Sequence, residues 1–269
     1  MGIASNSIMN RRAALGLAAT GIVGISLASC AQGAQSNPKR TDVTGIICAM
    51  PSEVEAIQAA MSHATTTTIA SMDFIEGTLD DKNVIVAQCG MGKVNAGICA
   101  HTMINIFGAV RIINSGVAGS LTKELGLNDF VISVDAVQHD YDVSPIGFKR
   151  GEIPYTGLVA FAADEQLRIK ALEAVKQVAP DSKVLEGRVC SGDQFIANQE
   201  QIQAITEAFG GLCAEMEGAA IAQASYLNNT PFVIIRAISD DGDGMSFEEF
   251  QAEAARECSS AVLAMVRDL

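Results

Sequence analysis

Hydrophobic and polar residues follow two alternating patterns along this chain: short continuous apolar runs, and longer segments with an apolar residue at every third or fourth position. Continuous runs rich in β-branched residues are typical of buried strands, and the spaced pattern is typical of amphipathic helices. The last helix has the clearest pattern, since Ser246-Phe247-Glu248-Glu249 is a capping box and the apolar residues after it fall on one face. The pattern predicts strands at 44–49, 67–76, 82–89, 110–115, 130–138, 184–192, 211–216 and 231–238, and helices at 52–62, 93–107, 164–178, 199–208, 217–227 and 246–268.

The alternation of buried strands with helices predicts an α/β layer fold. Without residues 1–29 the chain has 240 residues, which is enough for one α/β domain with a large core. We therefore expect a single domain over residues 44–269.

The first 29 residues read as an export signal rather than as part of the fold. Arg11-Arg12 precede an uncharged apolar run, residues 13–28, that is too short for a comfortable membrane span. Leu27-Ala28-Ser29-Cys30 resembles a bacterial lipobox, which implies cleavage before Cys30 and a lipid on its sulfur, and the paired arginines also resemble a twin-arginine signal. We expect residues 30–43 to tether an exported protein to a bacterial membrane through that lipid, on its periplasmic or cell-surface side. A plain transmembrane anchor is the alternative.

The charge balance argues against nucleic acid as a partner. The formal net charge is −13 at pH 7, and it becomes −15 without residues 1–29, because Arg11 and Arg12 are the only charged residues there. No cluster of Lys and Arg marks a nucleic-acid face. The only membrane contact that we expect is the lipid on Cys30.

The cysteines and histidines do not form metal-binding patterns. Six cysteines remain besides Cys30, and they fall in apolar runs without CxxC spacing, which favours free buried thiols over disulfides. His63, His101 and His139 are scattered without ligand spacing, so we interpret each as a surface or hydrogen-bonded core residue. We expect no metal site.

Three acidic residues stand where predicted strands end and helices begin: Glu53, Glu217 and Asp240. Glu53 and Glu217 both fall near a helix start, where unpaired backbone N–H groups favour a carboxylate, so each could simply cap its helix. Asp240 ends the β-branched run 231–238, as a buried parallel strand does at a site. Ligands of open α/β sheets bind outside the carboxyl ends of strands, so three such acids predict one pocket.

The segment Cys190-Ser191-Gly192-Asp193-Gln194-Phe195-Ile196 is a polar turn that carries one aromatic ring. A planar base could stack on Phe195. A buried core position for this ring is the alternative. Glycine turns at residues 89–93 and 114–120 allow close approach of the backbone to a ligand, but neither matches a dinucleotide fingerprint or a P-loop.

Together these motifs resemble the 5′-methylthioadenosine/S-adenosylhomocysteine nucleosidases, in the family's order and spacing from about residue 44 to the C-terminus. The resemblance implies a nucleoside-phosphorylase-like fold, with a central mixed twisted sheet flanked by helices in three layers, and a homodimer. It implies hydrolysis of the N-glycosidic bond of an adenine nucleoside, without a cofactor. The residues that carry it are Gly45 to Met50 with Glu53, Cys89 to Lys93, Asn114 to Gly119, His139 to Val143, Ser191 to Ile196, Glu215 to Glu217, Arg236 to Asp240 and Ser246 to Phe250.

The resemblance also implies roles for individual residues. Glu53 matches the glutamate that activates the attacking water, and Asp240 matches the acid that protonates adenine N7. Glu217 matches the carboxylate that holds the ribose hydroxyls. The remaining binding residues that it implies are Phe195, stacked on adenine; Ile196, whose backbone reads the base edge; Arg236, which helps position the water-activating glutamate; Ser239, which precedes the acid; and Met50, Met91, Met216 and Phe247, which form the apolar wall around ribose and the 5′-alkylthio group.

Hydrolysis of an N-glycosidic bond also requires residues of these types on chemical grounds. Cleavage of an N-glycosidic bond develops positive charge on the sugar and negative charge on the base, so one side needs a protonated acid and the other a base for water. Glu53 and Asp240 must therefore differ in protonation state, which burial and neighbours can arrange. Val117 stands where the family often has a small hydroxyl residue, so water positioning falls to Arg236, Ser115 or backbone amides.

Three other functions stay open from the sequence. A phosphorolytic purine nucleoside phosphorylase shares the fold, but an anionic nucleophile would be repelled by Glu53, and the glycine turns offer Lys93 but no arginine. A nucleosidase for another 5′-substituted nucleoside, such as futalosine, has the same pocket chemistry. A lipid-anchored nucleoside-binding protein without turnover would need a contact to the ribose, but not both an acid and a base.

Overall fold

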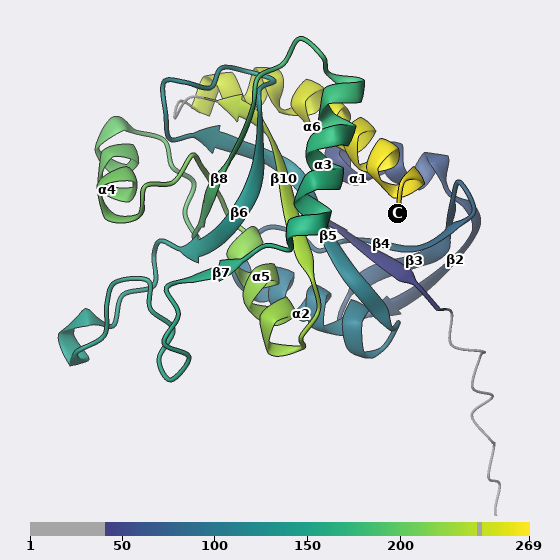
Figure 1. Ribbon diagram of the computed structural model, residues 1–269, viewed down its shortest axis with the longest axis horizontal. Helices are drawn as coiled ribbons and strands as arrows, with labels where there is room; N and C mark the ends of the chain where they lie inside the picture. Colours follow the sequence, from purple (N-terminus) through teal and green to yellow (C-terminus); the bar gives the residue numbers. More distant parts are fainter. Residues whose placement is uncertain (1–40, 241–243) are drawn as a thin grey trace, which may run out of the picture. The chain divides into compact units, whose positions relative to one another are not determined.

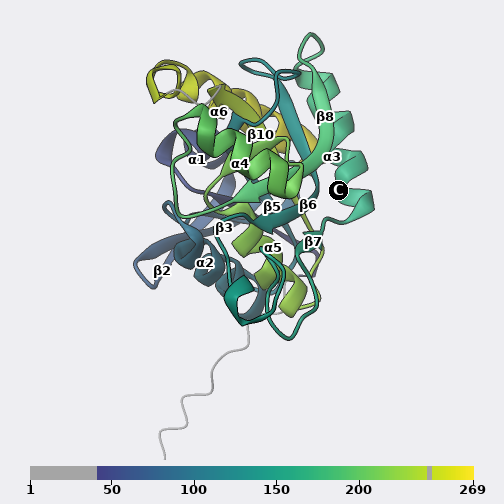
Figure 2. The same cartoon turned by 90° about the vertical axis from the view of Figure 1, so that its left-hand side faces the viewer.

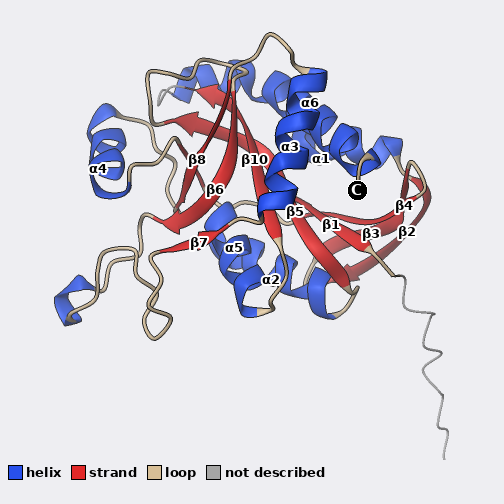
Figure 3. Ribbon diagram, viewed as in Figure 1, coloured by secondary structure: helices blue, strands red, loops and turns tan. Residues whose placement is uncertain are grey.

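A mixed β-sheet with helices on both faces runs through the part of the chain that the computed structural model describes, residues 41–240 and 244–269 (Figures 1 and 3). The predicted export signal and Cys30 lie outside the described residues. The strands are β1 (Val43–Cys48), β2 (Ser62–Ile69), β3 (Met72–Leu79), β4 (Lys82–Gln88), β5 (Ala109–Ser120), β6 (Phe130–Gln138), β7 (Ala160–Ala162), β8 (Val184–Ser191), β9 (Cys213–Glu215) and β10 (Phe232–Asp240). The helices are α1 (Pro51–Ala60), α2 (Lys93–Asn105), η1 (Ser144–Ile146, a 3₁₀ turn), α3 (Glu165–Val178), α4 (Gln199–Phe209), α5 (Gly218–Leu227) and α6 (Gly244–Arg267).

The sheet is open at one end and closed at the other. At the open end β2, β3 and β4 form an antiparallel meander, and β4 continues in parallel pairing to β1 and then to β5. From β5 the pairings run to β10, β6, β8 and β9 and return to β5, so these five strands form a ring. The predicted mixed sheet is confirmed, and the ring is a feature that the strand pattern alone did not indicate.

The sheet separates two apolar cores. Helices α1, α3 and α6 cover one face, and α2 and α5 cover the other; the side view in Figure 2 shows α1 and α6 above the sheet and α2 and α5 below it. Successive strand residues point to opposite faces, so Ile46 packs into the first core and Ile47 into the second. This arrangement is the predicted three-layer α/β fold. A smaller cluster, which includes Ile196 and Phe209, lies under α4.

The structure differs from the predicted elements mainly around two strands. The strand predicted at 67–76 is wrong: a turn at Ala70 and Ser71, both with positive φ (52° and 61°), divides this region into β2 and β3. Hairpin turns of this kind usually carry Asn or Gly, and this one carries neither, so the turn signal was missing. Strand β5 is longer than predicted and includes the segment 114–120 that was interpreted as a glycine turn. Strand β7 was not predicted, and α6 begins at Gly244 rather than at Ser246.

The six cysteines in the described residues are all buried and unpaired, as the sequence predicted. His63 and His101 are on the surface, whereas His139 is buried with a ring Nε2 that has no hydrogen-bond partner in the described part of the chain. Within residues 41–240 and 244–269, no group of three or more His, Cys, Asp or Glu side chains is placed to hold a metal ion. The helices of that same part are too short or too polar to cross a membrane.

Candidate active site

A pocket lies where β1, β5, β9 and β10 end and α1, α5 and α6 begin. Its volume is about 640 Å³, including the space open to solvent. Among the residues predicted to bind or react, only Arg236 does not line it. The ten predicted residues that do line it are Met50, Glu53, Met91, Phe195, Ile196, Met216, Glu217, Ser239, Asp240 and Phe247.

Glu53 is held by three backbone N–H groups at one side of the pocket. Its Oε2 accepts hydrogen bonds from the N–H groups of Ala49 (2.8 Å) and Met50 (2.9 Å), and its Oε1 accepts one from Val117 (3.1 Å). The bond to Met50 completes a capping box at the start of α1, so the capping interpretation is correct, and the same carboxylate also faces the pocket. Burial raises the pKa of Glu53, although Arg236 and the three N–H donors act in the opposite direction.

Glu217 does not cap its helix. It stands at the N-cap position of α5, but its side chain makes no capping hydrogen bond. Glu215 caps α5 instead, because its carboxylate accepts hydrogen bonds from the N–H groups of Glu217 (3.1 Å) and Gly218 (2.8 Å). Glu217 instead accepts the N–H of Gly92 (2.9 Å) and lines the pocket. Burial, followed by the nearby charge of Glu215, raises the pKa of Glu217 to about 7.

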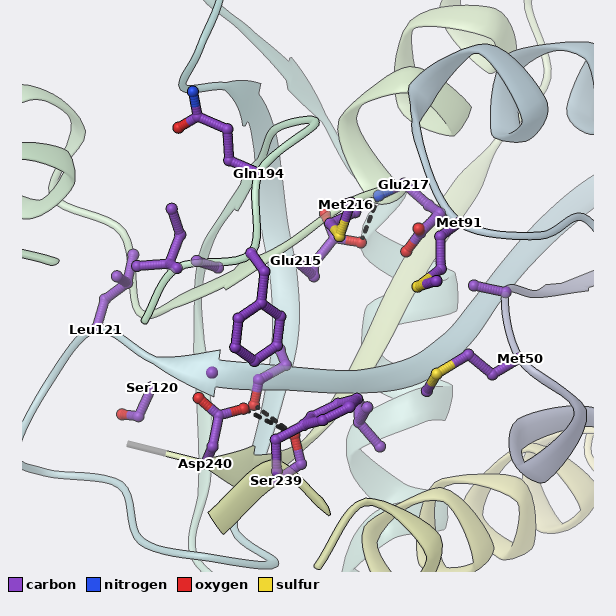
Figure 4. Close-up of a pocket in the computed structure, with 18 of the residues that line it drawn as sticks. Met50, Met91, Ser120, Leu121, Gln194, Glu215, Met216, Glu217, Ser239 and Asp240 are labelled. Carbon is purple, nitrogen blue, oxygen red and sulfur yellow. Dashed lines mark hydrogen bonds between the residues drawn. The ribbon is translucent and has the colours of Figure 1, made fainter. Parts of the chain in front are cut away.

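Asp240 lies at the end of β10, against the backbone of β5. The hydroxyl of Ser239 donates a hydrogen bond to it (3.1 Å), and its side chain is buried. A Cβ atom at Gly119 would come within 2.8 Å of Asp240 Oδ1, so only glycine fits there without displacing the carboxyl group. Figure 4 shows Asp240 beside Ser239 at one end of the pocket and Glu217 beside Met91 at the other.

The aromatic ring predicted to stack on a base is at the pocket and not in the core. Phe195 is 45% exposed, and its ring meets the ring of Phe247 edge-on with centroids 5.2 Å apart. The loop that carries Phe195 is anchored through Asp193, which accepts the N–H of Lys93 (2.8 Å) and donates its own N–H to Asp140 (2.9 Å). The ring of Phe195 is therefore accessible to a planar ligand, and the hydrogen bonds of Asp193 hold its loop in place.

Arg236 lies beneath the pocket and is fully buried. Its guanidinium donates to Glu215 and to Asn114 Oδ1 (2.7 Å), and it lies 3.7 Å from Glu217. A Cβ atom at Gly116 would collide with Arg236 Nη1 and approach Glu53 Oε1 to 2.6 Å, so the two side chains meet over this glycine. 

Of the groups predicted to position the attacking water, neither Arg236 nor Ser115 lines the pocket. Ser115 shares a hydrogen bond with Cys258 (3.3 Å) and does not line the pocket. The backbone N–H of Val117 is directed at Glu53. The backbone amide is thus the only one of the three types of group that lies beside Glu53 in the pocket wall.

Sequence reasoning missed the role of Glu215. This residue is buried, and it accepts hydrogen bonds from the Ser191 hydroxyl, two backbone N–H groups and Arg236. The sequence Glu215-Met216-Glu217 shows two acidic residues at this strand end, but the pattern does not indicate which of the two carboxylates faces the ligand. Gln194, Leu121 and Ile202 also line the pocket without having been predicted.

Similar proteins support one family for this chain. The sequence model of the Phosphorylase superfamily matches residues 43–267. The 5′-methylthioadenosine/S-adenosylhomocysteine nucleosidase of Staphylococcus aureus (strain JH9) is 41% identical over 229 residues, which cover 84% of this chain and 99% of the relative. The structure of the nucleosidase of that name from Neisseria meningitidis, in complex with methylthio-immucillin-A, has a TM-score of 0.82 at 35% identity and covers 85% of this chain and 100% of its own.

The structure of a futalosine hydrolase of Helicobacter pylori is also similar, with a TM-score of 0.80 at 31% identity over 85% of this chain and 98% of its own. The fold, the pocket and these matches agree over the whole described core. The chain therefore belongs to the phosphorylase superfamily and, within it, to the family of the 5′-methylthioadenosine/S-adenosylhomocysteine nucleosidases.

Proposed function

We propose that this protein hydrolyses the N-glycosidic bond of 5′-methylthioadenosine and S-adenosylhomocysteine, releasing adenine and the 5′-thioribose product. The observation that carries the proposal is the placement of two buried carboxyl groups, Glu53 and Asp240, in one pocket. Glu53 approaches β5 at Gly116 and Asp240 approaches it at Gly119, which are separated by about 10 Å of extended backbone. A separation of this order leaves room for a sugar and an attacking water between a base and an acid.

Asp240 acts on the base. Adenine lies against the ring of Phe195, with its edge along the backbone of Ile196, and Asp240 donates a proton to N7 as the bond to the sugar breaks. The proton neutralises the negative charge that develops on the departing base. Ser239 supports the carboxyl group by its hydrogen bond of 3.1 Å.

Glu53 acts on the water. Its three backbone N–H donors fix the carboxylate, and a water bound to it loses a proton as it attacks the sugar carbon. The described residues that line the pocket include no Lys or Arg. Phosphate as a nucleophile would lack a cation and would face the charge of Glu53, so water is favoured.

The remaining residues hold the sugar and its 5′ group. Glu217 accepts the ribose hydroxyls, because its carboxylate lines the pocket and, among the described residues, accepts a hydrogen bond only from the N–H of Gly92. Met50, Met91 and Met216 supply a polarizable apolar wall that suits a thioether tail.

The signal-free protein, residues 30–269, tests this function through release of the base, each time with and without phosphate: adenine from methylthioadenosine and S-adenosylhomocysteine, and hypoxanthine from futalosine and inosine. We expect adenine and a free thiosugar from the first two nucleosides at rates that do not change with phosphate. Release that requires phosphate would identify a phosphorylase, and tight binding without release would identify a nucleoside-binding protein. Release from futalosine alone would change the assigned 5′ substituent.

The Asp240→Asn variant separates turnover from binding. We expect turnover to fall by about 10²–10⁴-fold, because the amide cannot protonate N7 at neutral pH, while methylthioadenosine still binds. Asp73→Asn, which neutralises an exposed carboxylate on β3, is the matched control. Steady-state kinetics and calorimetric binding measure the two quantities, and an equal loss of both in the Asp240 variant would contradict its role as the acid.

We further propose that residues 1–29 are an export signal, that residues 30–43 are a tether with a lipid on Cys30, and that residues 44–269 are the nucleosidase domain. The support is the sequence Leu27-Ala28-Ser29-Cys30 after a short apolar run.

The full chain, expressed in a bacterium that processes lipoproteins, should therefore fractionate with membranes. Cys30→Ser should move it to the soluble fraction or leave an uncleaved precursor, whereas Ser29→Ala, which keeps a small residue before the cysteine, should not. Immunoblots of fractions and the mass of the N-terminal peptide measure this. Membrane association of the Cys30→Ser variant with a cleaved N-terminus would contradict the lipid anchor.

We also propose that the protein is a homodimer through the outer faces of α2 and α5. The support is a stripe of exposed apolar side chains, with Val94 (72% exposed) and Ile98 (42%) on α2, Ile106 (67%) directly after it, and Leu227 (63%) at the end of the neighbouring α5. A patch of this kind is typical of a protein interface.

Replacing two residues of this stripe together, Val94→Asp and Ile98→Asp, should give monomers, because the charges cannot be buried between subunits. Ile169→Asp on α3, which is 42% exposed on the opposite layer, is the matched control and should leave the mass unchanged. Light scattering coupled to gel filtration measures the mass. A monomeric unmodified protein, or a dimeric double variant, would contradict this interface.

A further inference from the structure

Three buried carboxylates share one buried guanidinium beneath the pocket. Glu53, Glu215 and Glu217 are 2%, 7% and 5% exposed, and Arg236 is fully buried. Burial alone would lower the pKa of Arg236, but the surrounding carboxylates raise it, so the guanidinium stays charged. One positive charge cannot neutralise three carboxylates, and a buried unpaired charge is costly, so the cluster favours holding a proton.

Glu215 is the member of this cluster that accepts hydrogen bonds from the most donors in the described part of the chain. Besides the ion pair with Arg236, its carboxylate accepts the Ser191 hydroxyl and the N–H groups of Glu217 and Gly218 at the start of α5. These donors and the ion pair hold the carboxylate of Glu215 in place between Arg236 and the start of α5.

Glu217 is stabilised less. It accepts one N–H, from Gly92, and lies 3.7 Å from Arg236, whose guanidinium is directed at Glu215 and Asn114. Its carboxylate faces the pocket, where a proton or a pair of ribose hydroxyls can occupy it.

We propose that Glu215 is a positioning residue for the reaction: by holding Arg236 and the start of α5, it leaves the carboxylate of Glu217 free for the ribose. This inference rests on the proposed nucleosidase function. Glu215 does not act on the substrate itself, but it lies beside Glu217 in the chain and carries the charge opposite Arg236.

The electrostatic surroundings of Glu217 agree with this assignment. The groups that face it are Glu215 on β9, Arg236 on β10, Glu53 on α1 and Cys89 after β4. Burial raises the pKa of the Cys89 thiol far above its ordinary value, so this group is neutral. Burial first and Glu215 second raise the pKa of Glu217 to about 7. The carboxylate that accepts ribose hydroxyls is therefore lost as the pH falls through about 7.

The Glu215→Gln variant tests the proposal through the pH dependence of kcat/KM for methylthioadenosine. Removing the charge of Glu215 takes away a repulsion on Glu217 and frees Arg236 to pair with it, so the acid limb should move by about one unit or more to lower pH. The value at the optimum should also fall, because Arg236 and α5 lose their partner. Glu173→Gln, an exposed carboxylate on α3, should change neither.

A uniform loss of kcat/KM in Glu215→Gln, with the acid limb where the unmodified protein has it, would overturn the proposal, since a merely structural residue gives that result. Circular dichroism checks the fold of the variant. If Glu215→Gln does not fold, Glu215→Asp keeps the charge and should lower kcat/KM while the acid limb stays; a shifted limb there would also overturn the proposal. If the unmodified protein releases no adenine at any pH, it is the proposed function that fails.

Discussion

The site depends on one buried cation, Arg236, on strand β10 of the ring. A guanidinium without solvent must be paired and hydrogen-bonded; here Nη2 donates to Glu215 and Asn114, whereas Nε and Nη1 are buried without a hydrogen-bond partner among the described residues. Asn114 in turn donates to the carbonyl of Ile47 (3.0 Å), which joins the network to β1 and so to the start of α1. Polar contacts beneath the pocket therefore fix the ends of β1, β5, β9 and β10 relative to one another. These strand ends in turn determine where the carboxylates of Glu53, Glu217 and Asp240 lie.

The backbone of β5 forms the other half of this arrangement. Its two glycines, Gly116 and Gly119, lie where Glu53 and Asp240 approach the strand too closely for a side chain. Both carboxyl groups can be buried against the same strand because that strand presents bare backbone, and one of its N–H groups, at Val117, is used to bind Glu53. A segment that reads as a flexible turn is thus an extended strand whose missing side chains make room for the site.

Much of the fold, the three acidic residues of the pocket and the candidate ring of Phe195 followed from local sequence patterns, whereas the methionines, Ile196 and Phe247 were predicted from the family resemblance. Long apolar runs such as Phe232–Asp240 give buried strands whatever their neighbours, and the polar residues that end them fall at one edge of the sheet. The parts that could not be predicted depend on contacts between distant segments. Nothing local distinguishes Glu215 from Glu217, since the assignment is decided by the start of α5 and by Arg236. The closure of the ring and the turn at Ala70 are likewise set by strand pairing rather than by residue type.

The same contacts connect structure to chemistry. Anchoring by backbone N–H groups keeps Glu53 in place for its proposed role as a base for water, while Asp240 shares its end of the pocket with Ser239 and has the exposed ring of Phe195 in the same pocket wall. Glu217, whose carboxylate accepts the N–H of Gly92 and lies 3.7 Å from Arg236, stands between them in the proposed position of the sugar. In the proposed reaction, these three positions orient the nucleoside in one direction, with its base toward β10 and its 5′ group toward the methionines.

A crystal structure of the Asp240→Asn variant with methylthioadenosine bound would test the proposed roles of Asp240, Glu217 and Glu53 most directly. We expect adenine N7 to face residue 240 and the adenine ring to stack on Phe195. We expect the ribose hydroxyls to bind Glu217, and a water bound to Glu53 to lie beneath the sugar carbon. A nucleoside bound in the reverse direction, or with Glu53 out of reach of any water near that carbon, would contradict these roles.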